Sequence, residues 1–549
     1  MEKRTLVALA ISFAVLAFYP LALQKFYPDY YKKNAQTQKA APAGASTRAS
    51  GDMKERTILK NVPDHAAGSF IAGDDILFNN GKLDMMFNSK GAGIRQVDFL
   101  SFLNQETKRP LRFFSLQNVE GSPTFLHFIQ SSPEIDSQVP NYQVRQETSS
   151  SIVASAGVSQ GLKIHKRYEW APEGYSADLI VELENVSDKA IELQYQIFAG
   201  TSVPPRHSID GQYIEANFYA VKDGKGALRH LNETKAGKAV PSVGPVEWVA
   251  VKDRHFSVIL EPKGGLPFMG LHEGLGNHQF RTSLVSEMIT VPARSSARHE
   301  FLLYIGPNDL EHLLPLGLDP LVNFGKLDVI GKFLVGALEM IHKVVRNYGI
   351  AIILLTMLIN LILFPLTRAS YMSMKRMQLV QPQMNKLREH HKKNPEKLNK
   401  EMMELYKKHK VNPFGGCLPM VLQMPVFIAL YVALSKSVIL IGASFLWAKD
   451  LSSPDSVPLP FSFPLLGNEI HLLPLIMAGA MGVQQKFTQI KIEGQDPAME
   501  AQQKMMAVMM PVVFCFIFYS MPSGLVLYWL TNTLLMTAYQ LRLKNMTLA

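Results

Sequence analysis

The chain has 549 residues, of which 47% are hydrophobic and 19% are charged. A soluble globular protein carries about 25% charged residues, so long uncharged segments are expected here. Lys and Arg number 56 and Asp and Glu number 46, which gives a formal net charge of +10. The two cysteines exclude a disulfide-rich fold, and neither lies at metal-site spacing from the other or from a pair of histidines.

Residues 1–26 are predicted to form a transmembrane anchor. Lys3 and Arg4 precede Thr5–Leu23, a run of 19 residues without a charge. At about 1.5 Å per residue, this run just crosses a hydrocarbon core of about 30 Å. A cleaved signal peptide is the alternative, but it usually has a shorter apolar core and a small-x-small cleavage site. The two basic residues place the N-terminus in the cytoplasm. Residues 27–56, rich in Ala, Ser, Thr and Gln, are expected to form a flexible linker.

Residues 57–312 are predicted to form a large β-sandwich outside the membrane. Apolar and polar residues alternate in segments 163–170, 177–184 and 190–198, which is typical of half-buried strands. The Asn80-Gly81 pair lies between two short apolar runs and predicts a hairpin. No apolar run in this region is long enough to span a bilayer.

Candidate chemistry in this region is scarce. His272, Glu273 and His278 suggest a metal site, but the spacing differs from the zinc-binding helix motif. Because Gly274 and Gly276 disfavour a helix, a loop is expected there instead. The chain contains neither a Gly-x-Ser-x-Gly nucleophile motif nor a phosphate-binding loop that ends in Gly-Lys-Ser/Thr. No catalytic residue, cofactor or metal site is therefore predicted, and the protein is not expected to be an enzyme.

A membrane region is predicted from residue 319 onward. Residues 319–346 are assigned to an interfacial segment, because 327–346 has apolar residues at helical spacing and charged residues opposite them. The next segment, Tyr348–Leu366, has 19 residues without a charge and is predicted to span the bilayer. Pro365 is expected to end that helix, and Arg368 marks its cytoplasmic end.

Residues 369–410 are predicted to form a cytoplasmic helical hairpin. From residue 367 to residue 410 there are 12 Lys and Arg and 4 Glu, a net charge of +8, which favours a cytoplasmic location. Asn394-Pro395 predicts a turn between two helices. Apolar residues at alternating spacings of three and four suggest that the helices pack as a short antiparallel coiled coil. The positions are Met377, Val380, Met384 and Leu387 on one side and Leu398, Met402 and Leu405 on the other.

Four more apolar segments complete the predicted membrane core, residues 347–549. They are 418–434, expected to be broken at Pro419 and Pro425, then 470–484, 505–519 and 525–541. Segment 436–469 is expected to lie on the outer side, with 438–447 dipping into the interface. The predicted fold is therefore a multi-domain membrane protein with six transmembrane helices, five of them in the core, a large β-sandwich on the outer side of the membrane and a cytoplasmic hairpin. Both termini are expected in the cytoplasm.

Four sequence strings resemble the YidC/Oxa family of membrane protein insertases, in the form found in Gram-negative bacteria. They are Phe364-Pro365-Leu366-Thr367, Val411-Asn412-Pro413-Phe414-Gly415-Gly416-Cys417-Leu418-Pro419, Gln423-Met424-Pro425-Val426-Phe427 and Pro522-Ser523-Gly524-Leu525-Val526-Leu527-Tyr528. The resemblance implies insertion and folding of inner-membrane proteins, alone or with the Sec translocon. It implies a periplasmic β-supersandwich and a groove open to the cytoplasm and to lipid. The implied partners are nascent inner-membrane proteins, the Sec translocon, the ribosome and membrane lipids, with no DNA.

Two positions depart from the family pattern. Asn360 stands where the family usually has a groove arginine, and Trp529 stands where it has a second tyrosine. Thr356 and Asn360 share a helical face, as do Trp529 and Asn532. These polar groups are expected to line the groove, with hydrogen bonds between helices as the alternative. The predicted groove residues are Thr356, Asn360, Gln423, Tyr528, Trp529 and Asn532, and the predicted ribosome or lipid contacts are Lys392, Lys393, Lys407 and Lys408.

Two other classes of function fit the sequence less well. A membrane-tethered sugar- or peptide-binding enzyme that acts through the β domain needs convergent carboxylates, a Ser/His pair or a ligand cluster, and the sequence suggests none. A channel or secondary transporter often has repeated halves with broken helices and paired charges. No internal repeat is evident, and the five C-terminal segments carry no charge in their middle.

Overall fold

The computed structural model describes a β-rich unit and a helical unit, and the β-rich unit ends at Asn323. The predicted anchor (1–26) and linker (27–56), together with Lys392, Lys393 and His278, lie outside the described residues. The structure describes residues 73–104, 107–116, 120–135, 139–202, 211, 213–222, 225–231, 237–276, 279–391, 394–409, 418–463, 467–488 and 497–544.

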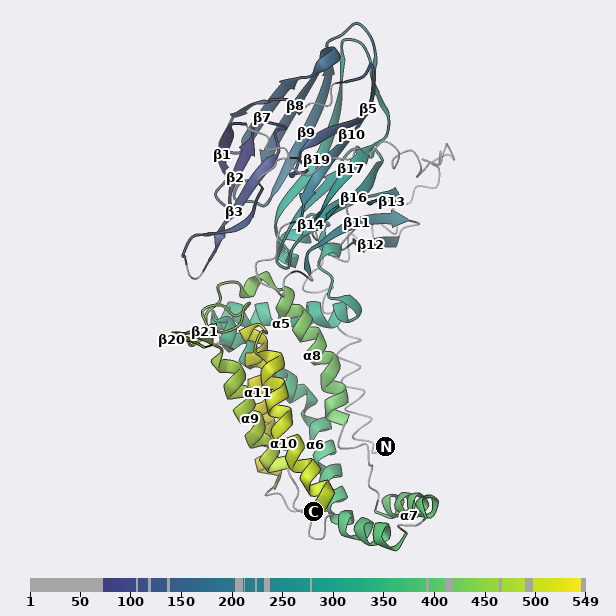
Figure 1. The fold of residues 1–549 in the computed structure, drawn as a ribbon, viewed down its shortest axis with the longest axis vertical. Coiled ribbons are helices and arrows are strands. Elements are labelled where there is room, and N and C mark those ends of the chain that lie inside the picture. Colours follow the sequence, from purple (N-terminus) through teal and green to yellow (C-terminus); the bar gives the residue numbers. More distant parts are fainter. Residues whose placement is uncertain are drawn as a thin grey trace. The chain divides into compact units, whose positions relative to one another are not determined.

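The β-rich unit contains three antiparallel sheets (Figure 1). The largest has nine strands in the order β12-β11-β14-β15-β19-β9-β8-β7-β6. The second has six strands, β13-β16-β17-β10-β18 with β5 also on β10, and the third has the order β1-β2-β3-β4. The strands are β1 (Asp75–Asn79), β2 (Leu83–Asn88), β3 (Ile94–Leu103), β4 (Pro110–Ser115), β5 (Leu126–Ser132), β6 (Gln143–Gln146), β7 (Ser151–Gly157), β8 (Leu162–Trp170), β9 (Ser176–Asn185), β10 (Ile191–Thr201), β11 (Glu215–Lys222), β12 (Lys225–Leu231), β13 (Ala239–Pro245), β14 (Trp248–Lys252), β15 (Phe256–Pro262), β16 (Phe268–Gly276), β17 (Gln279–Ser286), β18 (Ile289–Val291) and β19 (Ser295–Pro307).

The two larger sheets pack face to face and form a β-sandwich. Tyr195 of β10 and His299 of β19 lie in different sheets, yet the Tyr195 hydroxyl is hydrogen-bonded to His299 Nδ1 at 2.5 Å and the rings stack. Along β8, buried and more exposed residues alternate from Leu162 to Trp170, as expected where one face covers a core. The strands predicted over 163–170, 177–184 and 190–198 are confirmed as β8, β9 and β10, and the hairpin at Asn80-Gly81 is confirmed between β1 and β2.

The loop predicted at His272 and Glu273 is wrong, because both residues lie within strand β16. The pairing of β16 with β17 shifts between Gly274 and Gly276, and Gly276 has a φ of 85°. These glycines therefore belong to an irregularity at the end of a strand, where the backbone conformation suits glycine. Glu273 is buried and accepts a hydrogen bond from Arg281 Nε at 3.0 Å.

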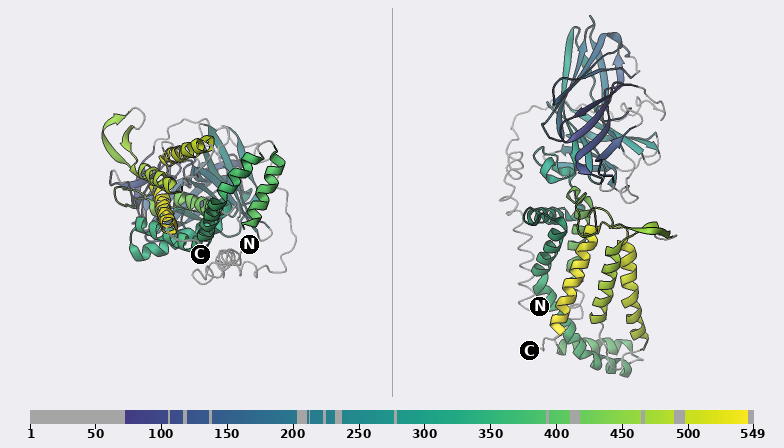
Figure 2. Two further views of the ribbon diagram at one scale, coloured as in Figure 1. Left: turned by 90° about the horizontal axis from the view of Figure 1, so that it is seen from below. Right: turned by 90° about the vertical axis from the view of Figure 1, so that its left-hand side faces the viewer.

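The helical unit contains seven α-helices of more than ten residues among the described residues, with α9 beside both α10 and α11 (Figure 2). The helices are α5 (Asp328–Val345), α6 (Tyr348–His390), α7 (Pro395–Lys408), α8 (Leu418–Lys436), α9 (Leu472–Thr488), α10 (Pro497–Phe518) and α11 (Ser523–Lys544). The amphipathic helix predicted over 327–346 is confirmed as α5. A short hairpin, β20 (Val457–Phe463) and β21 (Gly467–Ile470), precedes α9 and was not predicted.

The predicted helix end at Pro365 and the predicted break in the segment 418–434 are both wrong. Helix α6 continues for 43 residues through Pro365 and Pro382, and α8 runs from Leu418 to Lys436 with Pro425 inside. A proline in a helix interior removes one hydrogen bond and costs about 3 kcal/mol in water. The helix is held against α11 on both sides of Pro365, because Asn360 and Tyr371 of α6 both bond to α11.

The chain between α8 and α9 closes one end of this unit. Residues Val438–Leu440 form a short 3-10 turn at the start of the apolar run 438–447. The buried carboxylate of Asp455 accepts hydrogen bonds from Trp447 Nε1 and from the backbone N–H of Leu473, both at 2.9 Å. Phe445 lies on the first turn of α6 at Gly349, where an added Cβ would come within 2.2 Å of its ring. This connection therefore fixes the starts of α6 and α9.

Candidate functional site

Helices α6 and α11 run side by side in the same direction and carry most of the predicted groove residues. Asn360 Nδ2 of α6 donates to Asn532 Oδ1 of α11 at 3.0 Å. Further along, the Gln540 side-chain amide of α11 donates to the Tyr371 hydroxyl of α6. The two pairs are separated by 172 and 169 residues in the chain, and this nearly constant offset requires a parallel arrangement.

The side chain of Asn360 has a second hydrogen bond within its own helix. Its Nδ2 also donates to the Thr356 carbonyl oxygen at 2.8 Å, and the side chain is only half-buried. Thr356 itself is fully buried, and its hydroxyl donates to the Ile352 carbonyl oxygen at 2.7 Å. Thr356 thus uses its donor within its own helix, whereas the Asn360 amide donates both within α6 and to α11. Only Asn360 of this pair has a side chain accessible to a further binding partner.

A second polar contact joins α8 to α11. Gln423 Nε2 donates to the Tyr528 hydroxyl at 2.6 Å. Tyr528 is buried, whereas Gln423 is half-buried. Tyr528 and Asn532 are four residues apart and therefore lie on neighbouring parts of one face of α11. The structure thus brings Asn360, Gln423, Tyr528 and Asn532 together around one helix.

Trp529 belongs to a separate aromatic cluster. Its ring centroid lies 4.7 Å from that of Phe427 on α8 and 5.3 Å from those of Phe514 and Phe518 on α10. Asn532, three residues later, contacts α6 instead. The two residues therefore do not form one contact surface, although helical spacing suggested it. Phe514 and Phe518 were missed, and their separation of four residues on a helix was the available signal.

The basic segment consists of two helices, the second half of α6 and α7, that pack against each other. Val380 and Met384 of α6 are buried against Met377, Leu405 and Tyr406, so the two helices share a small apolar core. The Asn394 side chain accepts a hydrogen bond from the Lys397 backbone N–H at 3.1 Å and caps the start of α7. Lys407 and Lys408 are exposed in the last turn of α7.

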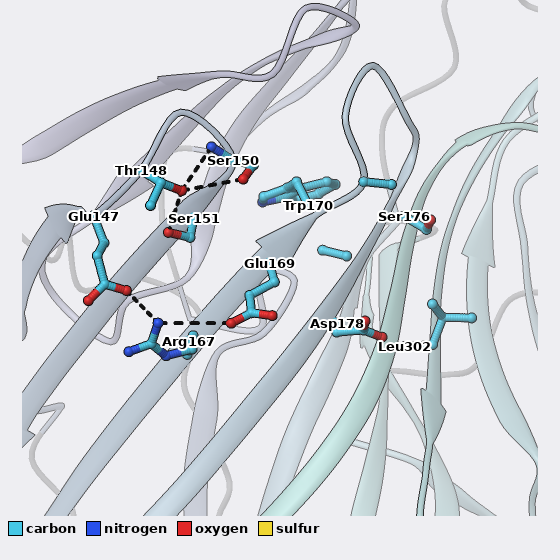
Figure 3. A pocket seen from close by; sticks show the side chains of 12 residues that line it. Glu147, Thr148, Ser150, Ser151, Arg167, Glu169, Trp170, Ser176, Asp178 and Leu302 are labelled. Carbon is cyan, nitrogen blue, oxygen red and sulfur yellow. Dashed lines mark hydrogen bonds and ion pairs between the residues drawn. The ribbon is translucent and has the colours of Figure 1, made fainter.

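The β-rich unit has a polar cavity of about 460 Å³ on β7, β8 and β9 (Figure 3). Arg167 points between two carboxylates in Figure 3, forming an ion pair with Glu147 and lying 3.9 Å from Glu169. Asp178 and the nearly buried Trp170 also line the cavity. One guanidinium thus pairs with two of the cavity's three carboxylates, which leaves the lining with a net negative charge.

The helical unit has the apolar character of a membrane domain. Among the described residues, one helical segment, Tyr348–Met377, is long and apolar enough to cross a bilayer by itself. Shorter apolar helical segments are Gln423–Lys436 and Ala507–Phe518. Large apolar side chains are exposed along α10, where Phe516 is 73% exposed and Val508 is 67% exposed. Exposed apolar surface of this extent marks an interaction surface, here one suited to lipid.

Comparison with known proteins identifies both units. Residues 75–337 match the family model described as the YidC periplasmic domain, and residues 340–548 match the model described as 60Kd inner membrane protein. A membrane protein insertase YidC from Pelobacter propionicus is 30% identical over 100% of this chain and 99% of the relative. The protein of the same description from Syntrophus aciditrophicus is 31% identical over 98% and 99%. A crystal structure of an active YidC insertase covers 87% of this chain and 94% of its own, at 20% identity and a TM-score of 0.37.

The fold and the matched families define a membrane protein with a large β-rich periplasmic domain and a helical membrane core. Full-length relatives at 30% and 31% identity are all described as one kind of protein. The chain belongs to the YidC family of membrane protein insertases of the bacterial inner membrane. The family resemblance that rested on four strings is confirmed.

Proposed function

We propose that this chain inserts inner-membrane proteins and assists their folding by binding them at the polar contacts between α6, α8 and α11. The observation that carries this proposal is the half-buried Asn360–Asn532 hydrogen bond. Polar side chains in the middle of a membrane-spanning helix usually bond to another helix or line a pathway for a substrate. The chain acts by binding alone, without covalent chemistry, and it works either by itself or with the Sec translocon.

The amide pair suits a client that carries polar groups into the membrane. Each asparagine side chain offers two donors and one acceptor, so it can exchange its present bond for one to a client. Such an exchange replaces one hydrogen bond with another, so neither the asparagine nor the client's polar group is left unpaired. The transfer of an unpaired polar group into hydrocarbon, by contrast, is costly in free energy. Asn360 therefore lowers the cost of passage by hydrogen bonding, without the charge of the arginine usual in the family.

The proposed topology has six transmembrane helices, with both termini in the cytoplasm and the β-rich unit in the periplasm. The length of α6 supports it, because 43 residues extend about 64 Å and a bilayer core needs about half of that. The second half of α6 and helix α7 then form the basic hairpin in the cytoplasm. The amphipathic α5 lies in the plane of the periplasmic interface. The proposed domain limits are 1–26, 27–56, 57–312, 319–346 and 347–549.

The hairpin is proposed to contact the ribosome or anionic lipid headgroups. Its exposed lysines, Lys407 and Lys408, together with Lys392 and Lys393, supply positive charge beside the membrane. Each cation near an anionic surface contributes about 1 kcal/mol to binding. Nascent inner-membrane proteins reach the polar contacts of the core from this side.

Site-specific photo-crosslinking tests where a client binds. A photoreactive residue is placed at Asn360 or at Asn532, and a short inner-membrane client is inserted into vesicles that contain the full chain. The matched control is the neighbouring Leu361, which lies at the same depth of α6 but is 70% exposed. We expect client adducts at Asn360 and Asn532 in clear excess over Leu361. Equal yields at the three positions contradict a binding site at the polar contacts.

A further inference from the structure

Two arginines lie within about 8 Å of one another in level on the parallel helices α6 and α11, because Arg368 precedes Tyr371 by three residues and Arg542 follows its partner Gln540 by two. Arg368 follows Asn360 by 8 residues and Arg542 follows Asn532 by 10 residues, and the two asparagines are bonded to each other. The arginines therefore lie about 12 and 15 Å further along the helix axes. Arg368 is also 20 residues beyond the start of α6, which is about 30 Å or one hydrocarbon thickness.

An aromatic cluster lies between the helices beside the two arginines. Tyr539 is three residues before Arg542 on α11, and the charges of Arg368 and Arg542 both act on its hydroxyl. The Tyr539 ring makes edge contacts with Phe364, at 5.0 Å between centroids, and with Tyr371, at 5.6 Å. Tyrosines and arginines at one level of a membrane protein are typical of the boundary between hydrocarbon and headgroups.

These positive charges have no counter-ion within the part of the chain that the structure describes. Neither Arg368 nor Arg542 forms an ion pair there, and both side chains are exposed. The sequence of α11 has no Asp or Glu, and α6 has only Glu389, near its far end. The Tyr539 hydroxyl is covered and has no hydrogen-bond partner among the described residues, which leaves a donor unused.

The surroundings of the arginines suit a lipid better than a soluble anion. Leu361 and Phe364 on α6, and Leu541 on α11, are exposed apolar side chains on the same two helices. An acyl chain can therefore lie along the helices while its headgroup remains at the level of the arginines. An arginine guanidinium binds a phosphate through two parallel hydrogen bonds, and two guanidinium groups match the oxygens of one phosphate.

We propose that Arg368 and Arg542, which flank the Tyr371–Tyr539 ring contact, bind the phosphate of an anionic phospholipid at the α6–α11 seam. This inference rests on the membrane placement of α6 and α11 proposed above. The bound headgroup holds α6 and α11 together at this level through their charges. It lies below the Asn360–Asn532 contact and is separate from the client-binding residues.

The test measures lipid selectivity of the full chain in the absence of any client. The chain is reconstituted in phosphatidylcholine vesicles, and spin-labelled phosphatidylglycerol and phosphatidylcholine report the motionally restricted lipid. The variant pair R368Q/R542Q removes both charges. The control pair R376Q/K386Q removes two exposed charges further along α6. We expect the preference for phosphatidylglycerol to fall about tenfold in the first pair and to stay within twofold in the control.

The outcomes separate the possible sources of phosphate. Added inorganic phosphate should leave the restricted phosphatidylglycerol signal unchanged, and displacement by it overturns the assignment to a lipid. An unchanged preference in R368Q/R542Q overturns the site itself, as does an equal loss in the control pair. Loss of ribosome binding with unchanged lipid selectivity places the arginines on an RNA surface instead. If the double variant does not fold, R542Q alone should show a smaller loss. Because no client is present, these results are independent of whether the chain inserts proteins.

Discussion

The Asn360 amide on α6 donates to the Asn532 side-chain oxygen on α11 across 3.0 Å. This bond joins two parallel helices at a point where both have mainly apolar neighbours. The two asparagine side chains can have two roles. A half-buried amide can bond to the neighbouring helix in the resting protein and to a client during insertion. Variants at these two positions distinguish a dynamic role in insertion from a purely structural one.

Asn360→Arg should be tolerated and should change client preference. An arginine at mid-membrane costs about 2.5–3.5 kcal/mol on the scale of helix insertion, but Asn360 is half-buried beside other polar groups. The added charge should attract clients with acidic tails. We expect the ratio of insertion rates for an acidic client over its neutralised form to rise severalfold. A variant that accumulates normally and leaves this ratio unchanged contradicts the role given to Asn360.

Gln423→Leu should destabilise the helical unit more than Tyr528→Phe does. The Gln423 change leaves the buried Tyr528 hydroxyl without its donor, and an unsatisfied buried group costs about 1–3 kcal/mol. The double variant removes both partners and should recover part of the loss. Unfolding midpoints of the three variants in detergent form a double-mutant cycle. Additive losses would show that this hydrogen bond contributes nothing to stability.

The β-rich unit should lose stability in acid through Glu215 of β11. Burial alone raises the pKa of Glu215, but the hydrogen bond from His230 and the charge of Lys252, whose Nζ lies 2.7 Å away, outweigh it and lower the pKa from 4.5 to about 2. A carboxyl with a lowered folded pKa stabilises the fold above its unfolded pKa. This contribution should be complete above pH 4.5 and should disappear as the pH falls toward 2.

Glu215→Gln should therefore flatten the loss of stability between pH 5 and pH 3. Thermal unfolding of the full chain, followed by near-UV circular dichroism, measures this difference. Glu300→Gln is the control, because Glu300 is an exposed carboxylate on β19 that is paired with Arg298. A pH dependence that is the same in Glu215→Gln and in the unmodified chain contradicts the assignment to this cluster.

Alternating sequence patterns predicted the strands well because each large sheet has one face on a common core. Strand β8 is an example, with Ile164 and Tyr168 fully buried and Lys163 and Glu169 exposed. Lys166 lies on the buried face of β8, where the pattern predicts an apolar residue, yet the strand continues through it. Its ammonium donates to the carbonyl oxygens of Gly91 and Thr124, at 2.9 and 2.8 Å, so the charge-bearing group is satisfied inside the core.

The errors arose where contacts distant in sequence override a local preference. Pro365 is unfavourable in an isolated helix, yet α6 continues through it because residues on both sides bond to α11. Trp529 and Asn532 are on adjacent helical positions, but their partners lie on different helices. The Asp455 carboxylate that joins Trp447 to the start of α9 has no local sequence signature. Each of these features depends on a neighbour that no short sequence pattern identifies.

The most direct test of the central claim is the insertion rate of N360L/N532L for a small inner-membrane client, in vesicles that contain equal amounts of folded protein. The control is Thr537→Val on α11, whose hydroxyl donates to the Thr533 carbonyl oxygen of its own helix. We expect N360L/N532L to insert the client at least about tenfold more slowly, equivalent to about 1.4 kcal/mol, with Thr537→Val near the normal rate. A normal rate in N360L/N532L shows that the asparagines only hold helices together, and it contradicts the proposed client site.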